Sequence, residues 1–118
     1  MLAHPERNPT FKDEPGRLVR LVDDGFLVQV SADSLTELPR RSRTRRLATR
    51  LVAEGLAHVL ASDSHGAAVG RRSRLSEAVE VAERLAPGTG AWLVTEAPAA
   101  VLSGEPLPPL PRVVAGRR

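Results

Sequence analysis

Three short apolar runs, each followed by a segment that can form a helix, constrain the fold of this chain more than any other feature. The runs cover residues 1–4, 26–30 and 56–61. Short, β-branched or aliphatic runs of this kind are typical of buried strands. Strands that alternate with helices imply parallel pairing through crossover connections. We therefore expect an α/β fold with a parallel sheet.

The segments between the runs carry helix signals. Asp13 can cap a helix with Pro15 in its first turn, and Gly25 can end that helix in a left-handed conformation. A second helix is expected from Arg41 to Gly55. A third is expected over residues 75–86, where apolar residues recur at i, i+3, i+4 and i+7. Each expected strand is thus followed by at least one helix.

The remaining segments set the expected domain boundary. Residues 31–39 read as a polar connection, with Ser73 as a cap for the third helix and short helical turns at 91–96 and after Pro98. Residues 106–118 are rich in proline and arginine and offer little to bury, so we expect a disordered tail there. The folded domain is accordingly expected over residues 1–105.

Composition excludes several classes of protein. The chain has no cysteine, so disulfides and thiolate metal sites are absent. Lys12 is the single lysine, so nearly all of the positive charge is arginine. The net charge of +3 would tolerate an anionic partner. No apolar run approaches the roughly 18 residues of a membrane span, and no signal peptide is evident, so we expect a cytoplasmic protein.

Polar side chains follow two of the expected strands. His4 ends the first, and Asp63 and His65 come directly after the third. Functional groups of parallel α/β folds collect beyond the carboxyl ends of strands. Carboxylate oxygen and imidazole nitrogen suit manganese, iron or zinc. The pattern therefore predicts a metal site at this edge of the sheet.

Plainer interpretations stay open for the same residues. Asp63 and His65 could serve only as turn and cap residues. His4 could be a surface or structural histidine, and Glu6 could pair with Arg7 or with an arginine of the second helix. His58 lies inside an expected strand, and we interpret it as a structural histidine with a hydrogen-bonded side chain.

Several segments form a recognisable series along the chain. They are LAHPERN from Leu2, GFLVQV from Gly25 with SLT from Ser34, GLAHVLASDSH from Gly55, RSRL from Arg72 and APAAVLSGE from Ala97. In register, from about Leu2 to Glu105, these segments resemble the bacterial PHP-type tyrosine-protein phosphatases associated with capsule and exopolysaccharide synthesis.

The resemblance implies a partial PHP-type distorted β/α barrel with a metal cluster at the carboxyl ends of its strands. It implies hydrolysis of phosphotyrosine on a partner protein, typically a bacterial tyrosine kinase. By match to the family motifs, the metal ligands would be His4, Asp63 and His65. Arg7, together with Arg71 or Arg72, would contact the phosphate. The expected cofactor is a divalent metal ion, most readily manganese, with iron or zinc as alternatives.

The departures from the family pattern are equally informative. The H-x-H pair and the acidic ligands of the family's N-terminal half are absent from this sequence. The chain therefore resembles the C-terminal half only, and we expect it to be weak or inactive alone. A half-barrel leaves an open sheet edge, so we also expect homo-oligomers, aggregation or marginal folding.

Two other functions compete with this hypothesis. A related phosphatase could act on histidinol phosphate instead of phosphotyrosine. Alternatively, the run of arginines from Arg40 to Arg50 could bind nucleic acid phosphates without catalysis. The scarcity of aromatic residues, only Phe11, Phe26 and Trp92, argues against the stacking surfaces that bind single strands. We therefore expect no nucleic acid partner.

Overall fold

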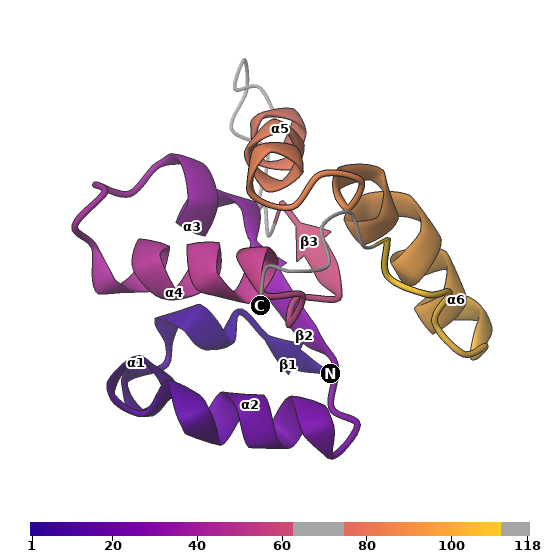
Figure 1. Ribbon diagram of the computed structural model, residues 1–118, viewed down its shortest axis with the longest axis horizontal. Coiled ribbons are helices and arrows are strands. Elements are labelled where there is room, and N and C mark those ends of the chain that lie inside the picture. The colour runs from indigo at the N-terminus through magenta and orange to yellow at the C-terminus, as the bar shows by residue number, and fades with distance from the viewer. Residues whose placement is uncertain (63–74, 112–118) are drawn as a thin grey trace.

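A small parallel sheet forms the centre of the molecule (Figure 1). The computed structural model describes residues 1–62 and 75–111. The sheet has the order β1-β2-β3, with β1 at Leu2–Ala3, β2 at Val28–Ser31 and β3 at Val59–Ala61. Both strand pairs are parallel. The expected parallel α/β class is confirmed, whereas the barrel that the resemblance implies remains a prediction.

Helical segments connect and flank the strands. They are the 3-10 turn η1 (Pro5–Arg7), α1 (Pro9–Asp13), α2 (Pro15–Asp23), α3 (Ala32–Thr36), α4 (Arg43–Ala53), α5 (Leu75–Leu85), the π-helical turn η2 (Trp92–Glu96) and α6 (Ala97–Ser103). Helix α4 lies between α3 and α1 (Figure 1). Helix α5 packs on α3, α4 and β3. None of the helices within the described ranges combines the length and apolar character needed to cross a bilayer.

Local sequence explains where the main helices begin and end. Pro15 starts α2, but the N-cap residue is Glu14 rather than Asp13, because Asp13 completes α1. Gly25 follows α2 with a φ of 102°, as its expected role requires. The Ser42 hydroxyl accepts a hydrogen bond from the Arg45 amide at 3.2 Å and so caps α4.

Two short helices were not expected. Helix α3 occupies the segment that we interpreted as a polar connection, and its residues Ala32, Ser34 and Leu35 are buried. Helix α1 lies in the proline-rich stretch after η1, where the Asn8 side chain accepts hydrogen bonds from the amides of Thr10 and Phe11. A five-residue helix spans little more than one turn, so it leaves almost no periodicity to detect.

The core joins the sheet to its helices, and the segment after Gly104 contributes to it. Its buried members include Leu18, Val28, Val30, Leu35, Leu47, Leu51, Leu60, Trp92 and Leu93. Leu107 and Leu110 pack against this core, and the Trp92 indole donates a hydrogen bond to the Pro108 carbonyl at 3.2 Å. This part of the expected tail therefore has packing partners. Residues 112–118 lie outside the described ranges, as does the expected cap Ser73.

The two outer strands of the described sheet are β1 and β3. Parallel sheets usually have their edges covered or paired. The expectation that copies of this chain associate therefore stays a prediction.

Candidate functional site

A tight turn at the carboxyl end of β1 brings His4 and Arg7 to the edge of the sheet; we call residues 4–7 the His4–Arg7 turn. His4 has a φ of 33° and a ψ of 59°, in the left-handed region. For a residue with a Cβ atom, this conformation costs about 1–2 kcal/mol. The His4 amide donates to the Gln29 carbonyl at 2.7 Å, and the His4 carbonyl accepts from the Arg7 amide at 3.1 Å. The chain thus leaves the sheet directly after β1.

The Glu6 side chain attaches this turn to the end of β2. Glu6 is 0% exposed, and its Oε2 accepts a hydrogen bond from the Ser31 amide at 2.9 Å. Ser31 is both the last residue of β2 and the N-cap of α3. The interpretation of Glu6 as an ion-pair partner of Arg7 or of an α4 arginine is therefore wrong: the ion pairs of the described residues do not include it.

His4 and Arg7 keep their side-chain polar groups available. His4 is partly buried and Arg7 is exposed. Within residues 1–62 and 75–111, neither the imidazole nor the guanidinium takes part in a hydrogen bond or ion pair. One imidazole and one guanidinium next to a strand end can bind a metal ion and an anion respectively.

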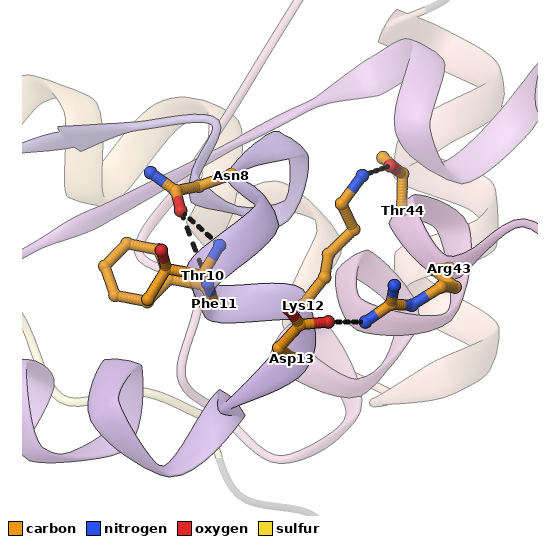
Figure 2. A network of polar contacts seen from close by, with 7 residues as sticks. All are labelled: Asn8, Thr10, Phe11, Lys12, Asp13, Arg43 and Thr44. Atoms are coloured by element: carbon orange, nitrogen blue, oxygen red, sulfur yellow. Dashed lines mark hydrogen bonds and ion pairs between the residues drawn. The ribbon is translucent and has the colours of Figure 1, made fainter.

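A polar network holds the helix that follows this turn against α4 (Figure 2). The Lys12 ammonium donates to the Thr44 hydroxyl at 3.1 Å, and Asp13 forms an ion pair with Arg43. The Asn8 side chain caps α1 directly after Arg7. Because α4 also contacts η1, the turn is supported from its C-terminal side.

The other predicted site residues follow β3 in the sequence. Strand β3 ends at Ala61, two positions before Asp63. Asp63, His65, Arg71 and Arg72 lie outside the described residues. Among the described residues, no three His, Asp or Glu side chains form a metal-binding group.

His58 has a structural role, as we interpreted it. Its Nδ1 accepts a hydrogen bond from the Val28 amide at 2.9 Å, and its own amide donates to the Val28 carbonyl at 2.9 Å. Burial lowers the pKa of the His58 imidazole, because a charged ring loses hydration there. The neutral ring is the form that can accept from Val28. This histidine therefore joins the segments that lead into β2 and β3.

The arginines around α4 are partly engaged in contacts within the molecule. Arg43 pairs with Asp13, Arg50 pairs with Glu54, and Arg45 donates to the Leu38 carbonyl. These contacts favour a solvated helix face with local ion pairs. The alternative of a nucleic-acid surface gains no support from them.

The contribution of Glu6 is the one that sequence reasoning missed. A glutamate beside Pro5 and Arg7 carries no sign that its side chain is buried, since charged residues are seldom buried without a partner. The hydrogen bond to Ser31 spans 25 positions and depends on the pairing of β1 with β2. Only the register of the sheet could have revealed it.

Comparison with known proteins identifies similar chains. A family model described as "Capsular polysaccharide synthesis, CpsB/CapC" matches residues 1–103. The chain is 31% identical over 96 residues to the tyrosine-protein phosphatase YwqE of Bacillus subtilis (strain 168), covering 81% of this chain and 37% of that protein. It is 35% identical over 65 residues to the provisionally named tyrosine-protein phosphatase CapC of Staphylococcus aureus, covering 55% of this chain and 25% of that protein. The chain thus matches between a quarter and just over a third of the length of these relatives.

Proposed function

The chain belongs to the CpsB/CapC family, and we propose that it supplies part of the active site of a metal-dependent phosphatase that hydrolyses phosphotyrosine on proteins. The observation that carries the proposal is the His4–Arg7 turn, which presents an imidazole and a guanidinium at the carboxyl end of β1. The names of the two relatives support phosphotyrosine as the substrate class.

The topology of the sheet supports a site shared by two segments. Strands β1 and β3 are both parallel to β2, so the chain leaves all three strands at the same edge. Neighbouring strands are separated by roughly 4.8 Å, so the ends of β1 and β3 are about 10 Å apart. His4 follows the first end and Asp63 follows the second in the sequence. Side chains that reach from both ends could converge above β2.

His4, Asp63 and His65 are the residues that we expect to hold the metal. The fit rests on the chemistry of the donors, and on the His4 imidazole, which has no hydrogen-bond partner among the described residues. Two imidazoles and a carboxylate suit manganese, iron or zinc. A bound divalent ion supplies Lewis acidity, which activates water at neutral pH and offsets charge on the phosphoryl oxygens.

Arg7 is expected to bind the phosphate, together with Arg71 or Arg72. A guanidinium can donate two parallel hydrogen bonds to phosphate oxygens, which both holds the group and fixes its orientation. Arg7 is exposed and free of ion pairs within the described part of the chain. The His4–Arg7 turn, which contains Arg7, is attached to β2 by two hydrogen bonds. The His4 amide donates to the Gln29 carbonyl, and the Glu6 carboxyl group accepts from the Ser31 amide. Arg7 is therefore available at a fixed place.

The partner that this chemistry fits is a phosphotyrosine protein, such as a bacterial tyrosine kinase. A related substrate, histidinol phosphate, would use the same metal and phosphate contacts. The two differ only beyond the phosphate, so competition between phosphotyrosine peptide and histidinol phosphate separates them.

The test is binding and hydrolysis by the chain itself. Because it matches only part of the relatives' length, binding of Mn²⁺ and of phosphotyrosine peptide is the primary measurement, with hydrolysis of p-nitrophenyl phosphate in Mn²⁺ as the second. We expect Mn²⁺-dependent peptide binding that Arg7→Ala weakens and that Arg46→Ala, on the exposed face of α4, leaves unchanged. Peptide binding that is independent of both Mn²⁺ and Arg7 would contradict the proposal.

A further inference from the structure

The hydrogen-bond ladder between β1 and β2 continues beyond the last residue of β1 through a side chain. Within the ladder, the Leu2 amide donates to the Leu27 carbonyl and the His4 amide to the Gln29 carbonyl, both at 2.7 Å. Alternate residues of a parallel strand face the same neighbour, so the next β2 amide directed at β1 is that of Ser31. The His4 carbonyl is engaged with Arg7 instead. Glu6 Oε2 takes its place and accepts from Ser31.

The burial of Glu6 is costly, and stability alone does not explain it. The residue is 0% exposed, and its Oε1 has no hydrogen-bond partner within the described residues. A buried carboxylate with incomplete pairing is less favourable than an apolar side chain of similar volume. A hydrogen bond from an amide to a carboxyl oxygen that is shielded from water is, however, strong and directional. The arrangement therefore favours fixed geometry over maximal stability.

The turn that Glu6 holds needs such support. His4 occupies the left-handed region, and no side chain caps the start of η1. The strained backbone is fixed before the turn by the bond between His4 and Gln29. Within the turn, the Glu6 carboxylate provides the side-chain hydrogen bond to β2. Because Pro5 and Arg7 are the sequence neighbours of Glu6, fixing Glu6 also restricts where these two residues lie.

We propose that Glu6 is a positioning residue whose buried carboxylate, by accepting the Ser31 amide, sets where the His4 imidazole and the Arg7 guanidinium stand. What those two groups bind rests on the proposed function. The positioning itself does not, because it concerns only the turn and β2.

Three substitutions separate the length of the side chain from its carboxyl group. Glu6→Gln keeps an acceptor oxygen at the same distance and replaces the carboxyl group with an amide. Glu6→Asp keeps the carboxyl group but is one methylene shorter, and Glu6→Ala removes the acceptor. If the hydrogen bond to Ser31 fixes the His4–Arg7 turn, the turn should lie in the same place in Glu6→Gln as in the wild type. In Glu6→Asp and Glu6→Ala the turn should no longer be held there.

Amide hydrogen exchange of the 118-residue chain, followed by NMR, measures the position directly. We expect the Ser31 amide to exchange at least about tenfold faster in Glu6→Asp and Glu6→Ala, since loss of one such hydrogen bond is worth that factor. The His4 and Arg7 amide resonances should move with it. Leu93→Ala, in a core residue that is 1% exposed and belongs to η2, controls for a general loss of stability. It should lower the melting temperature without selectively affecting Ser31.

A Mn²⁺ titration of the same samples gives the functional readout. Glu6→Ala should weaken Mn²⁺ binding by about tenfold or more, the usual effect of losing a group that orients a ligand, and Glu6→Gln should restore most of it. If the wild type binds no Mn²⁺, the proposed function fails while the Ser31 exchange still decides the positioning. Unchanged Ser31 exchange in Glu6→Asp and Glu6→Ala, or an equal change in Leu93→Ala, would overturn the inference. Equal Mn²⁺ affinity of the wild type and Glu6→Ala would also overturn it.

Discussion

At the scale of single residues, His4 combines an unfavourable backbone conformation with an imidazole that has no hydrogen-bond partner among residues 1–62 and 75–111. Its φ of 33° is the one positive value found among the non-glycine residues of the described ranges. Strain of this kind persists where neighbouring contacts over-determine the backbone, and it clusters at functional sites. At His4 those contacts are the bonds to Gln29 and Arg7 and the attachment through Glu6. The observed strain thus supports, independently of any resemblance, a role for the imidazole.

The strain predicts an unusual order of stability at position 4. His4→Gly should be more stable than His4→Ala by about 1 kcal/mol, because glycine adopts the left-handed conformation without the Cβ penalty. At Arg46, an exposed position within α4, the order should be reversed by about 1 kcal/mol. Urea denaturation of the four variants measures both differences. The same order at both positions would refute strain at His4.

His58 predicts how stability depends on pH. Burial lowers the His58 pKa in the folded chain, whereas in the unfolded chain the pKa has its ordinary value of about 6.5. As the pH falls below that value, the unfolded chain therefore binds a proton at His58 more readily than the folded chain does. The contribution of His58 is therefore fully present above pH 6.5 and is lost as the pH falls through its folded pKa. Unfolding free energies at several pH values between 8 and 5 should show this fall. His58→Gln should flatten that part of the profile, and a profile identical to that of the wild type would contradict the assignment.

At the scale of elements, apolar runs and long periodic segments predicted the structure well. Strands β2 and β3 overlap the apolar runs that predicted them, and helices α4 and α5 each bury a face long enough to leave a repeat. Helices α1 and α3 were missed, since they form through caps and tertiary packing. For the candidate site, sequence alone indicated His4 and Arg7. It could not indicate Glu6, whose role depends on the pairing of β1 with β2.

The connection after α5 gives a prediction at this scale. The Glu83 carboxylate accepts from the amides of Gly88 at 2.6 Å and Gly90 at 2.9 Å, and these hydrogen bonds lower the Glu83 pKa. A Cβ atom on Gly90 would meet Glu83 Oε1 at 2.9 Å and the Val79 carbonyl oxygen at 3.1 Å. Gly90→Ala should therefore destabilise the chain by about 1–3 kcal/mol in urea denaturation.

Gly16 is the matched control for that substitution. It lies in α2, and the nearest atom to an added Cβ is Arg20 Nη1 at 3.9 Å. Gly16→Ala should stabilise the chain by up to about 1 kcal/mol, because alanine is the better helix former. Equal effects of the two substitutions would show that the crowding at Gly90 is relieved by a local shift.

At the scale of the whole molecule, the parallel sheet accounts for how distant segments could form one site. Its order β1-β2-β3 brings the carboxyl ends of strands that are separated by some sixty positions to one edge. His4 and Arg7 stand at that edge on a turn that is anchored to β2 and supported by α4. Asp63 and His65 follow β3 in the sequence. The proposed function requires that these two groups of residues share a metal ion.

The most direct test of this claim is Mn²⁺ binding followed by paramagnetic broadening in NMR spectra of the 118-residue chain. We expect Mn²⁺ to broaden the resonances of His4 and of residues 63–65 together, at the same metal concentration. His4→Ala, Asp63→Ala and His65→Ala should each abolish both effects, whereas His58→Gln should preserve them. Broadening of one segment alone, or broadening at residues 63–65 that survives His4→Ala, would contradict a shared site.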